Sequence, residues 1–486
     1  MQFFPTVDED VQYFRSEGYT GSIDDMHYAA LGDLGYSGAL TDRLRAYLLV
    51  EFGSYYEAMR DLRNGTSVFA LLSYRILTLD PALVLDFDAT YYRVGGSDTD
   101  LVSAATHTRS STATYVDASG ILQTAGVNVP RVGHHLWDGA AWVDAGYFHE
   151  SEARTNLVTY SNGFADAYWV LDPQLSTPTQ GPTGPDGEAS AWTIVDNASG
   201  GSGFVYLDSQ NITVSNSTPY TASVFAKSDQ ISGLYLQVNS FTTPANGGVV
   251  FDLDAGSVGT ADAGFVGQIQ KVGSGWYRCS ITFTTDAADT SGKIRIGLYE
   301  GSGSIPVDGT SSILIYGAQL EAGSTPSSYI PTAGSTVTRA ADTMTIPAVN
   351  MPWSGTAVSI QMDGTMTGVS RTFAKWTLDA SNEIMLQSGA SNFTFTQEAG
   401  GVVDTVIGGS FTSGINVPFN IASRHGSTFL NGAVDGTALT ADLTPVALPD
   451  LSATDMQVAP TFMGTIKQLR VWADDITDAG IAEASA

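Results

Sequence analysis

The sequence predicts a mainly β protein built from two tandem antiparallel jelly-roll or β-sandwich domains. Short runs of alternating apolar and polar residues recur along most of the chain, and Gly, Asp, Asn and Pro turns separate them. Charged residues make up only 15% of the 486 residues while glycine reaches 52, a profile that favours strands and turns over helices. A chain of this length is expected to hold about three domains.

Residues 1–66 are the predicted exception, a short helical N-terminal anchor. They contain two related segments, GYTGSIDD and GYSGALTD, in which a glycine turn precedes a helix start. Apolar side chains between Leu44 and Leu62 recur every three or four positions and predict one broad helical face. So small a unit cannot bury such a face alone. We therefore expect this region to dock on a partner, and the chain to form a homotrimer or another symmetric oligomer.

The rest of the chain divides into three β segments. Residues 67–151 predict a small β-rich layer with a hairpin around Ala118–Gly120. Residues 152–347 predict a sandwich of eight strands, from SAWTIVD to SILIYGAQL. Residues 348–486 predict a second sandwich, with a hairpin turn at Asn431–Gly432 and a last strand, MGTIKQLRVW, followed by a short helix.

The segment Ser312–Asp342 is expected to close the first sandwich. Its first part alternates as a strand, and Glu321 ends the ladder before a turn rich in glycine, serine and proline. Tyr329 and Ile330 precede a proline, which favours an extended strap. The strap is expected to pack on the domain below it and to carry no chemistry.

Charge and composition exclude several functions. The net charge of −29 argues against nucleic acid as a partner, because phosphate binding needs clustered Lys and Arg. No apolar run is long enough to cross a membrane, and the N-terminus shows no signal peptide. The single cysteine, Cys279, is expected to be a small core residue.

The sequence offers few candidate catalytic or metal-binding groups, and each has a simpler structural explanation. Asp252 with Asp254, and Asp98 with Asp100, are acid pairs, but a chain with 50 acids contains such pairs by chance. Asp24–Asp25 and Asp474–Asp475 precede helices, where capping explains them. His134, His135 and His149 lack the spacing of a zinc site, although a fibre axis could use one or two such ligands. We predict no catalytic residue, cofactor or metal.

Aromatic side chains remain as candidates for binding. Sugar rings stack on aromatic rings because their C–H faces are apolar while their hydroxyls need hydrogen bonds. The candidates are Trp376 and Phe373 in the second sandwich, and Tyr235 and Tyr299 in the first. A core position is the competing interpretation for each, since half of a strand's residues face inward.

Three motifs carry a family resemblance. EARTNL with YSNGFADAYW, then GWYRCS, then YGAQLEAGSTPSSYIPT with VTRAAD occur in this order over about 190 residues. They resemble a carbohydrate-binding-like β-sandwich module of virion proteins of tailed bacteriophages, such as tail fibres and head spikes. The closing strand and helix of the chain are similar to those of concanavalin-like or laminin-G-like sandwiches.

The resemblance implies a structural attachment protein on the surface of a phage or gene-transfer particle, assembled in the bacterial cytoplasm. Its N-terminal region would dock on other virion proteins, and its sandwiches would bind host surface polysaccharide. Two alternatives stay open: a capsid or tail decoration that binds no sugar, and a polysaccharide depolymerase. The absence of a solenoid repeat weakens the enzyme alternative.

Overall fold

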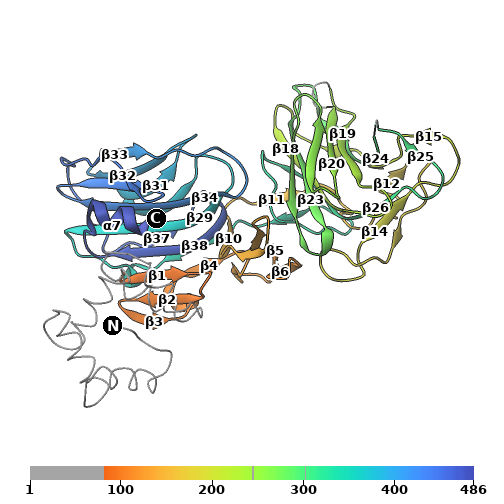
Figure 1. Ribbon diagram of the computed structural model, residues 1–486. Coiled ribbons are helices and arrows are strands. Elements are labelled where there is room, and N and C mark those ends of the chain that lie inside the picture. Colours follow the sequence, from red (N-terminus) through yellow and green to blue (C-terminus); the bar gives the residue numbers. More distant parts are fainter. Residues whose placement is uncertain (1–80, 243–245, 302) are drawn as a thin grey trace, which may run out of the picture.

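The computed structural model describes residues 81–486 except 243–245 and 302, and these residues form two lobes (Figure 1). Each lobe is a sandwich of antiparallel sheets, which confirms the mainly β fold class. The predicted helical anchor, Asp24–Asp25 and the apolar face from which an oligomer was inferred lie outside the described residues. Among the residues that the structure describes, no helix is long and apolar enough to span a membrane.

The central lobe is a jelly-roll-type sandwich of two sheets, named M1 and M2. Sheet M1 contains, in order, β12 (Trp169–Leu171), β16 (Tyr206–Ser209), β24 (Ser291–Tyr299), β19 (Gly233–Asn239), β20 (Gly247–Asp252) and β21 (Ser257–Ala261), with β17 (Ile212–Thr213) beside β24. Sheet M2 contains β13 (Thr179–Gln180), β14 (Trp192–Val195), β26 (Ser312–Ala322), β18 (Pro219–Ser228), β23 (Tyr277–Thr284) and β22 (Val266–Lys271). A short ladder joins β15 (Ser202–Gly203) to β25 (Ile305–Pro306).

Alternation along the strands builds the core of the central lobe. In β19, Leu234, Leu236 and Val238 are fully buried between the sheets. Their neighbours Tyr235 and Gln237 are half-buried on the opposite face of sheet M1. Because successive strand residues point to opposite faces, this pattern separates a dry interior from an outer face. Cys279 in β23 is fully buried in the same core, as predicted.

The outer face of sheet M2 is covered. Phe225, Tyr316 and Trp276 form a second apolar cluster there, and Tyr329 of the strap packs on it. The ring centroids of Tyr329 and Phe225 lie 5.7 Å apart. Leu122, in the hairpin of β5 (Ala113–Val116) and β6 (Leu122–Ala125), packs against the same cluster. The strap therefore packs on the lobe beneath it, as predicted.

The terminal lobe is a second sandwich, with sheets T1 and T2. Sheet T1 contains β3 (Ser97–Thr99), β2 (Tyr91–Val94), β1 (Leu83–Asp86), β38 (Met463–Trp472), β29 (Ala357–Met366), β34 (Val417–Gly426), β35 (Leu430–Val434) and β36 (Thr437–Ala438), with β10 (Tyr147–Glu150) and β7 (Arg131–Val132) attached at β38. Sheet T2 contains β33 (Val402–Gly408), β32 (Phe393–Ala399), β31 (Asn382–Ser388), β30 (Thr372–Asp379), β37 (Met456–Val458), β28 (Thr343–Ile346) and β4 (Thr106–Thr108). Short helices are α6 (Leu101–Ala104), η1 (Gly273–Gly275), η2 (Ala348–Asn350) and α7 (Thr477–Ala484).

The predicted terminal helix is present as α7. It packs on sheet T1, where Ile481 and Ala484 contact Trp472, Ala422 and Ala433. The hairpin turn predicted at Asn431–Gly432 is wrong, because both residues lie inside β35. A Cβ on Gly432 would stand 2.0 Å from the ring of Phe395, so close packing, not a turn, requires this glycine.

The central lobe is inserted into the terminal lobe. Strand β1 pairs with one half of β38, and β10 pairs with the other half of the same edge. The chain then crosses to the central lobe through β11 (Arg154–Asn156) and returns through β27 (Val337–Arg339), and these two strands pair with each other. Within residues 81–151, the described part of the segment predicted as a linking layer, most strands thus belong to the sheets of the terminal lobe.

Candidate functional site

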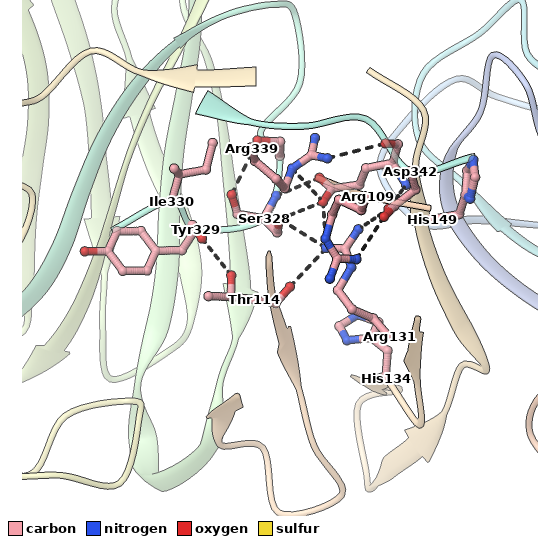
Figure 2. A network of polar contacts seen from close by, with 12 residues as sticks. Arg109, Thr114, Arg131, His134, His149, Ser328, Tyr329, Ile330, Arg339 and Asp342 are labelled. Atoms are coloured by element: carbon pink, nitrogen blue, oxygen red, sulfur yellow. Dashed lines mark hydrogen bonds and ion pairs between the residues drawn. The ribbon is translucent and has the colours of Figure 1, made fainter. Parts of the chain in front are cut away.

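The two chain crossings enclose a buried network of charged side chains (Figure 2). Arg131 of β7 donates to Glu150 at 2.7 Å and to Asp342 at 2.5 Å. Arg109 donates to the second oxygen of Asp342 at 2.9 Å, and Nε of Arg339 lies 3.1 Å from Glu150. All five side chains are at most about 1% exposed. The network joins residues on both sides of the crossings.

Electrostatics keep both carboxylates of this network ionised. Burial alone would raise the pKa of Glu150, but Arg339 and Arg131 outweigh it and lower that pKa to about 2. Burial would raise the pKa of Asp342 as well, but its neighbours, Arg131 first and then Arg109 among them, together outweigh burial and lower that pKa. The backbone N–H and hydroxyl of Ser328, in the strap, donate to Glu150 at 2.8 and 2.6 Å. The lobes are thus locked by charge pairs that persist across the neutral pH range.

The motifs that carry the family resemblance serve this junction. Asn156 of EARTNL donates to the carbonyls of Ala318 and Ile330. Arg278 of GWYRCS donates to the carbonyl of Ser327 at 2.5 Å. Glu321 accepts from the backbone N–H and the hydroxyl of Ser327 at 2.8 and 2.6 Å. These residues hold the strap and the crossings in place, so a ligand site must be sought elsewhere.

The histidines and paired acids singled out in the sequence have local structural partners. His134 accepts the backbone N–H of Val116 and stacks on Phe148, with centroids 4.5 Å apart. Nδ1 of His149 lies 3.0 Å from the hydroxyl of Tyr147, and Nδ1 of His135 lies 2.9 Å from the carbonyl of Gly133. In the described part of the chain, no group of three or more His, Cys, Asp or Glu side chains is arranged to hold a metal ion.

The paired carboxylates close turns. Asp252 accepts the backbone N–H groups of Asp254 and Ala255, both at 3.0 Å. Asp98 accepts the hydroxyl of Tyr91, and Asp100 accepts the backbone N–H of Ser103 in α6. Asp475, of the Asp474–Asp475 pair, accepts the N–H of Thr477, the first residue of α7, but the N-cap residue is Ile476, so neither acid of the pair is the helix cap.

Two of the four predicted aromatic candidates are core residues. Trp376 and Phe373 are fully buried between sheets T1 and T2. Trp376 donates its indole N–H to the carbonyl of Thr454, and Phe373 packs on Phe419 with centroids 4.6 Å apart. Neither ring offers a face to a ligand. The two residues have opposite parity in β30, and both are buried because the strand has a bulge between Thr372 and Ala374. These two assignments are corrected to core packing.

The other two candidates lie together on the outer face of sheet M1. The ring centroids of Tyr235 and Tyr299 are 5.9 Å apart. Phe204 lies 5.8 Å from Tyr235 and 5.6 Å from Tyr206. All four rings are partly exposed. We call these residues the aromatic face: Phe204, Tyr206, Tyr235 and Tyr299.

A glycine forms the floor of the aromatic face. Gly297 in β24 pairs with Tyr206 on one side and with Tyr235 on the other. A Cβ at Gly297 would stand 2.6 Å from the ring of Phe204, so that ring lies directly over the glycine backbone. Because Gly297 has no side chain, the rings of Phe204, Tyr206 and Tyr235 can form one continuous surface around it.

Polar groups flank the aromatic face in fixed positions. Arg295 donates through Nε and Nη2 to the two oxygens of Asp208, at 2.7 and 2.9 Å. Its guanidinium carbon lies 3.5 Å from the centroid of the Tyr206 ring. Burial disfavours the charge of Arg295, but its bond to Asp208 outweighs this and raises its pKa. The pair is therefore held flat against the aromatic face.

Tyr235 is also held in place. Its hydroxyl donates to Asp262 at 2.5 Å, and the backbone N–H of Gly248 donates to the same oxygen at 2.9 Å. Burial, and then the bond to Asp262, raise the pKa of Tyr235 to about 12. The ring is thus neutral and oriented before any ligand arrives.

Sequence reasoning missed Phe204, Tyr206, Arg295 and Asp208. The segment GFVYLD alternates as a strand, and this alternation places Phe204 and Tyr206 on one face and Val205 and Leu207 on the other. Which face is outward depends on the pairing of β16 with β24, and this pairing is not visible in one segment. Alternation together with the neighbouring strand's Tyr299 was the signal that could have found the site.

The described part of the terminal lobe contains an open hollow. It has a volume of about 540 Å³ and lies between Thr405–Ile407 of β33 and residues 438–442. It is wide open to solvent and carries no aromatic side chain. It therefore lacks the stacking surface that the central lobe provides.

Comparisons with known proteins show only partial likeness. No family model matches the chain, and no curated protein matches it. Similar solved structures include domain 4 of AbnA, a GH43 extracellular arabinanase from Geobacillus stearothermophilus, in complex with arabinotriose (13% identity, 30% of this chain and 73% of that chain, TM-score 0.25). A second is domains LG4-5 of the mouse laminin alpha1 chain (9% identity, 53% of this chain and 83% of that chain, TM-score 0.21). A third is the tail fibre protein gp63.1 from an E. coli phage (10% identity, 66% of this chain and 40% of that chain, TM-score 0.20). At these TM-scores the similar structures do not indicate what this chain binds.

Proposed function

We propose that this protein is a glycan-binding attachment protein of a tailed-phage or phage-like particle, and that the aromatic face is its sugar site. The observation that carries the proposal is the continuous row of four partly exposed rings on the outer face of sheet M1. The opposite sheet of the same lobe is covered by the strap and a hairpin. Sheet M1 is therefore the side of the central lobe on which large apolar rings remain accessible.

The chemistry of the face suits a sugar ring. Aromatic rings stack on the apolar C–H face of a sugar, and neighbouring polar groups bond its hydroxyls. Arg295 and Asp208, held against Tyr206, supply donors and acceptors at the edge of the rings. Gln237 lies next to Arg295 in the ladder and extends this polar row. Because these groups are already oriented, little side-chain entropy is lost on binding.

Replacement of Tyr235 by alanine is expected to weaken glycan binding about 10- to 100-fold without unfolding the lobe. Removal of a central aromatic contact in a binding site costs about 1.5–3 kcal/mol. The measurement is retention of the full chain on host-derived polysaccharide, followed by a titration. Tyr160→Ala is the matched control, since Tyr160 is a half-buried tyrosine of the same lobe that packs on Tyr168 outside the aromatic face. Equal loss in both variants, or no loss in Tyr235→Ala, would refute this site.

The same experiment separates the alternatives. A decoration protein would be retained on no polysaccharide. A depolymerase would release reducing ends during incubation, which the proposed binding function does not. Weak binding at each site is sufficient, because several copies on one particle raise the effective concentration.

The virion role rests on the resemblance of the three junction motifs. If residues 1–65 are the anchor, a chain lacking them is expected to keep the folded lobes but to be absent from purified particles. Immunoblotting of particles assembled with the shortened chain measures this directly. Circular dichroism of the same chain is the control for folding. Normal incorporation of the shortened chain would place the anchor elsewhere.

A further inference from the structure

The carboxylates around the aromatic face are not balanced by cations. Asp262 is exposed and bonds Tyr235, and Glu300 is exposed and follows Tyr299 directly. Asp252 and Tyr299 both pair with Gly233, one from each side, so they flank this glycine on neighbouring strands. Three acidic residues, Asp252, Asp262 and Glu300, therefore lie next to the residues that carry the rings of Tyr235 and Tyr299.

The nearest basic side chains do not offset these charges. Arg295 is already paired with both oxygens of Asp208, so this pair has no net charge. Lys293 lies on β24 four residues before Gly297, the ladder partner of Tyr206 and Tyr235, and six residues before Tyr299. These separations are about 13 and 20 Å along an extended strand. Both exceed the Debye length of about 10 Å at 0.1 M salt. The field at the rings is thus negative.

We infer that the aromatic face selects uncharged glycans and rejects polysaccharides that carry uronic acid or other anionic groups. This inference rests on the proposed sugar-binding function of the same face. A carboxylate on a bound sugar would lie near Asp262, Asp252 or Glu300 without a cation to pair with. A like charge placed so close disfavours the complex, whereas a hydroxyl in its place gains a strong acceptor.

Asp262 is the residue that makes this discrimination specific. Both of its hydrogen bonds, from Tyr235 and from Gly248, end on Oδ2. Among the described residues, no donor is bonded to Oδ1. That oxygen is free to accept a sugar hydroxyl beside the ring of Tyr235. The same oxygen repels an anionic substituent, so one group serves both to bind and to exclude.

The test compares neutral and acidic polysaccharides on the full chain. Native gels containing dextran, mannan or galactan are compared with gels containing alginate or polygalacturonate, at about 0.1 M salt, where the charge of Lys293 is screened from the rings. Wild-type protein is expected to be slowed by at least one neutral polymer and by neither polyuronate, and Tyr235→Ala is expected to abolish the slowing. The double variant Asp252→Asn, Asp262→Asn is expected to gain affinity for polyuronate by about five-fold per removed charge. Asparagine can still accept the Tyr235 hydroxyl, which preserves the ring position.

A matched control removes the effect of total charge. The double variant Asp379→Asn, Asp450→Asn deletes two exposed carboxylates in the terminal lobe and is expected to leave both affinities unchanged. Binding of wild type to polyuronate through Tyr235, as strong as to neutral polymers, would overturn the inference and leave the sugar site intact. An unchanged preference in the double variant would also overturn it. Failure of Tyr235 to matter for any polymer of either class would overturn the proposed function itself.

Discussion

Replacement of Arg131 by methionine is expected to destabilise the protein by about 3–5 kcal/mol. Arg131 is fully buried and bonds Glu150 and Asp342 at once. Methionine fills much of the same volume but leaves two buried carboxylates with less compensation. Breaking a buried ion pair by removing one partner costs far more than the intact pair contributes, because the remaining charge cannot be hydrated.

Urea unfolding of wild type and variant, followed by intrinsic fluorescence, measures this difference. Lys375→Met is the matched control, because Lys375 pairs with Glu383 at 3.0 Å on a partly exposed face of β30. This more exposed pair is expected to cost at most about 1 kcal/mol. The Arg131 variant is also expected to unfold in two steps, since the network holds the lobes together. A single transition with a shift as small as that of Lys375→Met would contradict the role assigned to the network.

Much of the strand content could be predicted because alternation is a local property. In YTASVFAKS and LYLQVNSF, each apolar residue of one parity is buried in the core, and both segments form strands, β18 and β19. The hairpin around Ala118–Gly120 was predicted for the same reason, because its turn chemistry lies within a few residues. Burial of Cys279 and the strap at Tyr329 were predicted from residues close in sequence, namely the strand after Trp276 and the proline at position 331.

The insertion of one lobe into the other could not be predicted in this way. Asp86 pairs with Gln468, nearly the full length of the described chain away. An edge strand such as β1 shows the same alternation whichever sheet it joins, so its partner is set by packing and not by its own residues. The network of Arg109, Arg131 and Asp342 could not be predicted for the same reason, since its members are separated by more than 200 residues of sequence.

The aromatic candidates show the same limit at the level of single residues. Trp376 and Tyr235 both sit in alternating strands, yet the first is in the core and the second is on an outer face. Burial depends on which face of the strand the opposite sheet covers, and the residues of one strand do not indicate which face that is. The hydroxyl of a tyrosine partly indicates an outer position, because a tyrosine at the surface can keep its polar end in water.

Acidification from pH 7 to pH 5 is expected to lower the free energy of unfolding by about 4 kcal/mol from two histidines alone. Burial lowers the pKa of His149 to about 4 and that of His134 to about 3. An unfolded histidine titrates near 6.5, so the unfolded chain takes up protons in this range while the folded chain does not. Stability is therefore full above pH 6.5 and is lost as the pH falls towards 4. Each fully buried histidine contributes about 2 kcal/mol of this loss by pH 5.

Thermal and urea unfolding at pH 7 and pH 5 test this expectation, with His149→Gln as the variant. Glutamine cannot titrate and can still bond the hydroxyl of Tyr147, so the variant is expected to lose about 2 kcal/mol less than wild type between the two pH values. His135→Gln is the control, because His135 is only half-buried. Glu150 does not confound the comparison, since its folded pKa of about 2 and its ordinary unfolded pKa both lie below this range. An identical pH dependence in wild type and His149→Gln would contradict this expectation, because it would mean that His149 takes up protons equally in the folded and unfolded chains and that burial does not lower its pKa.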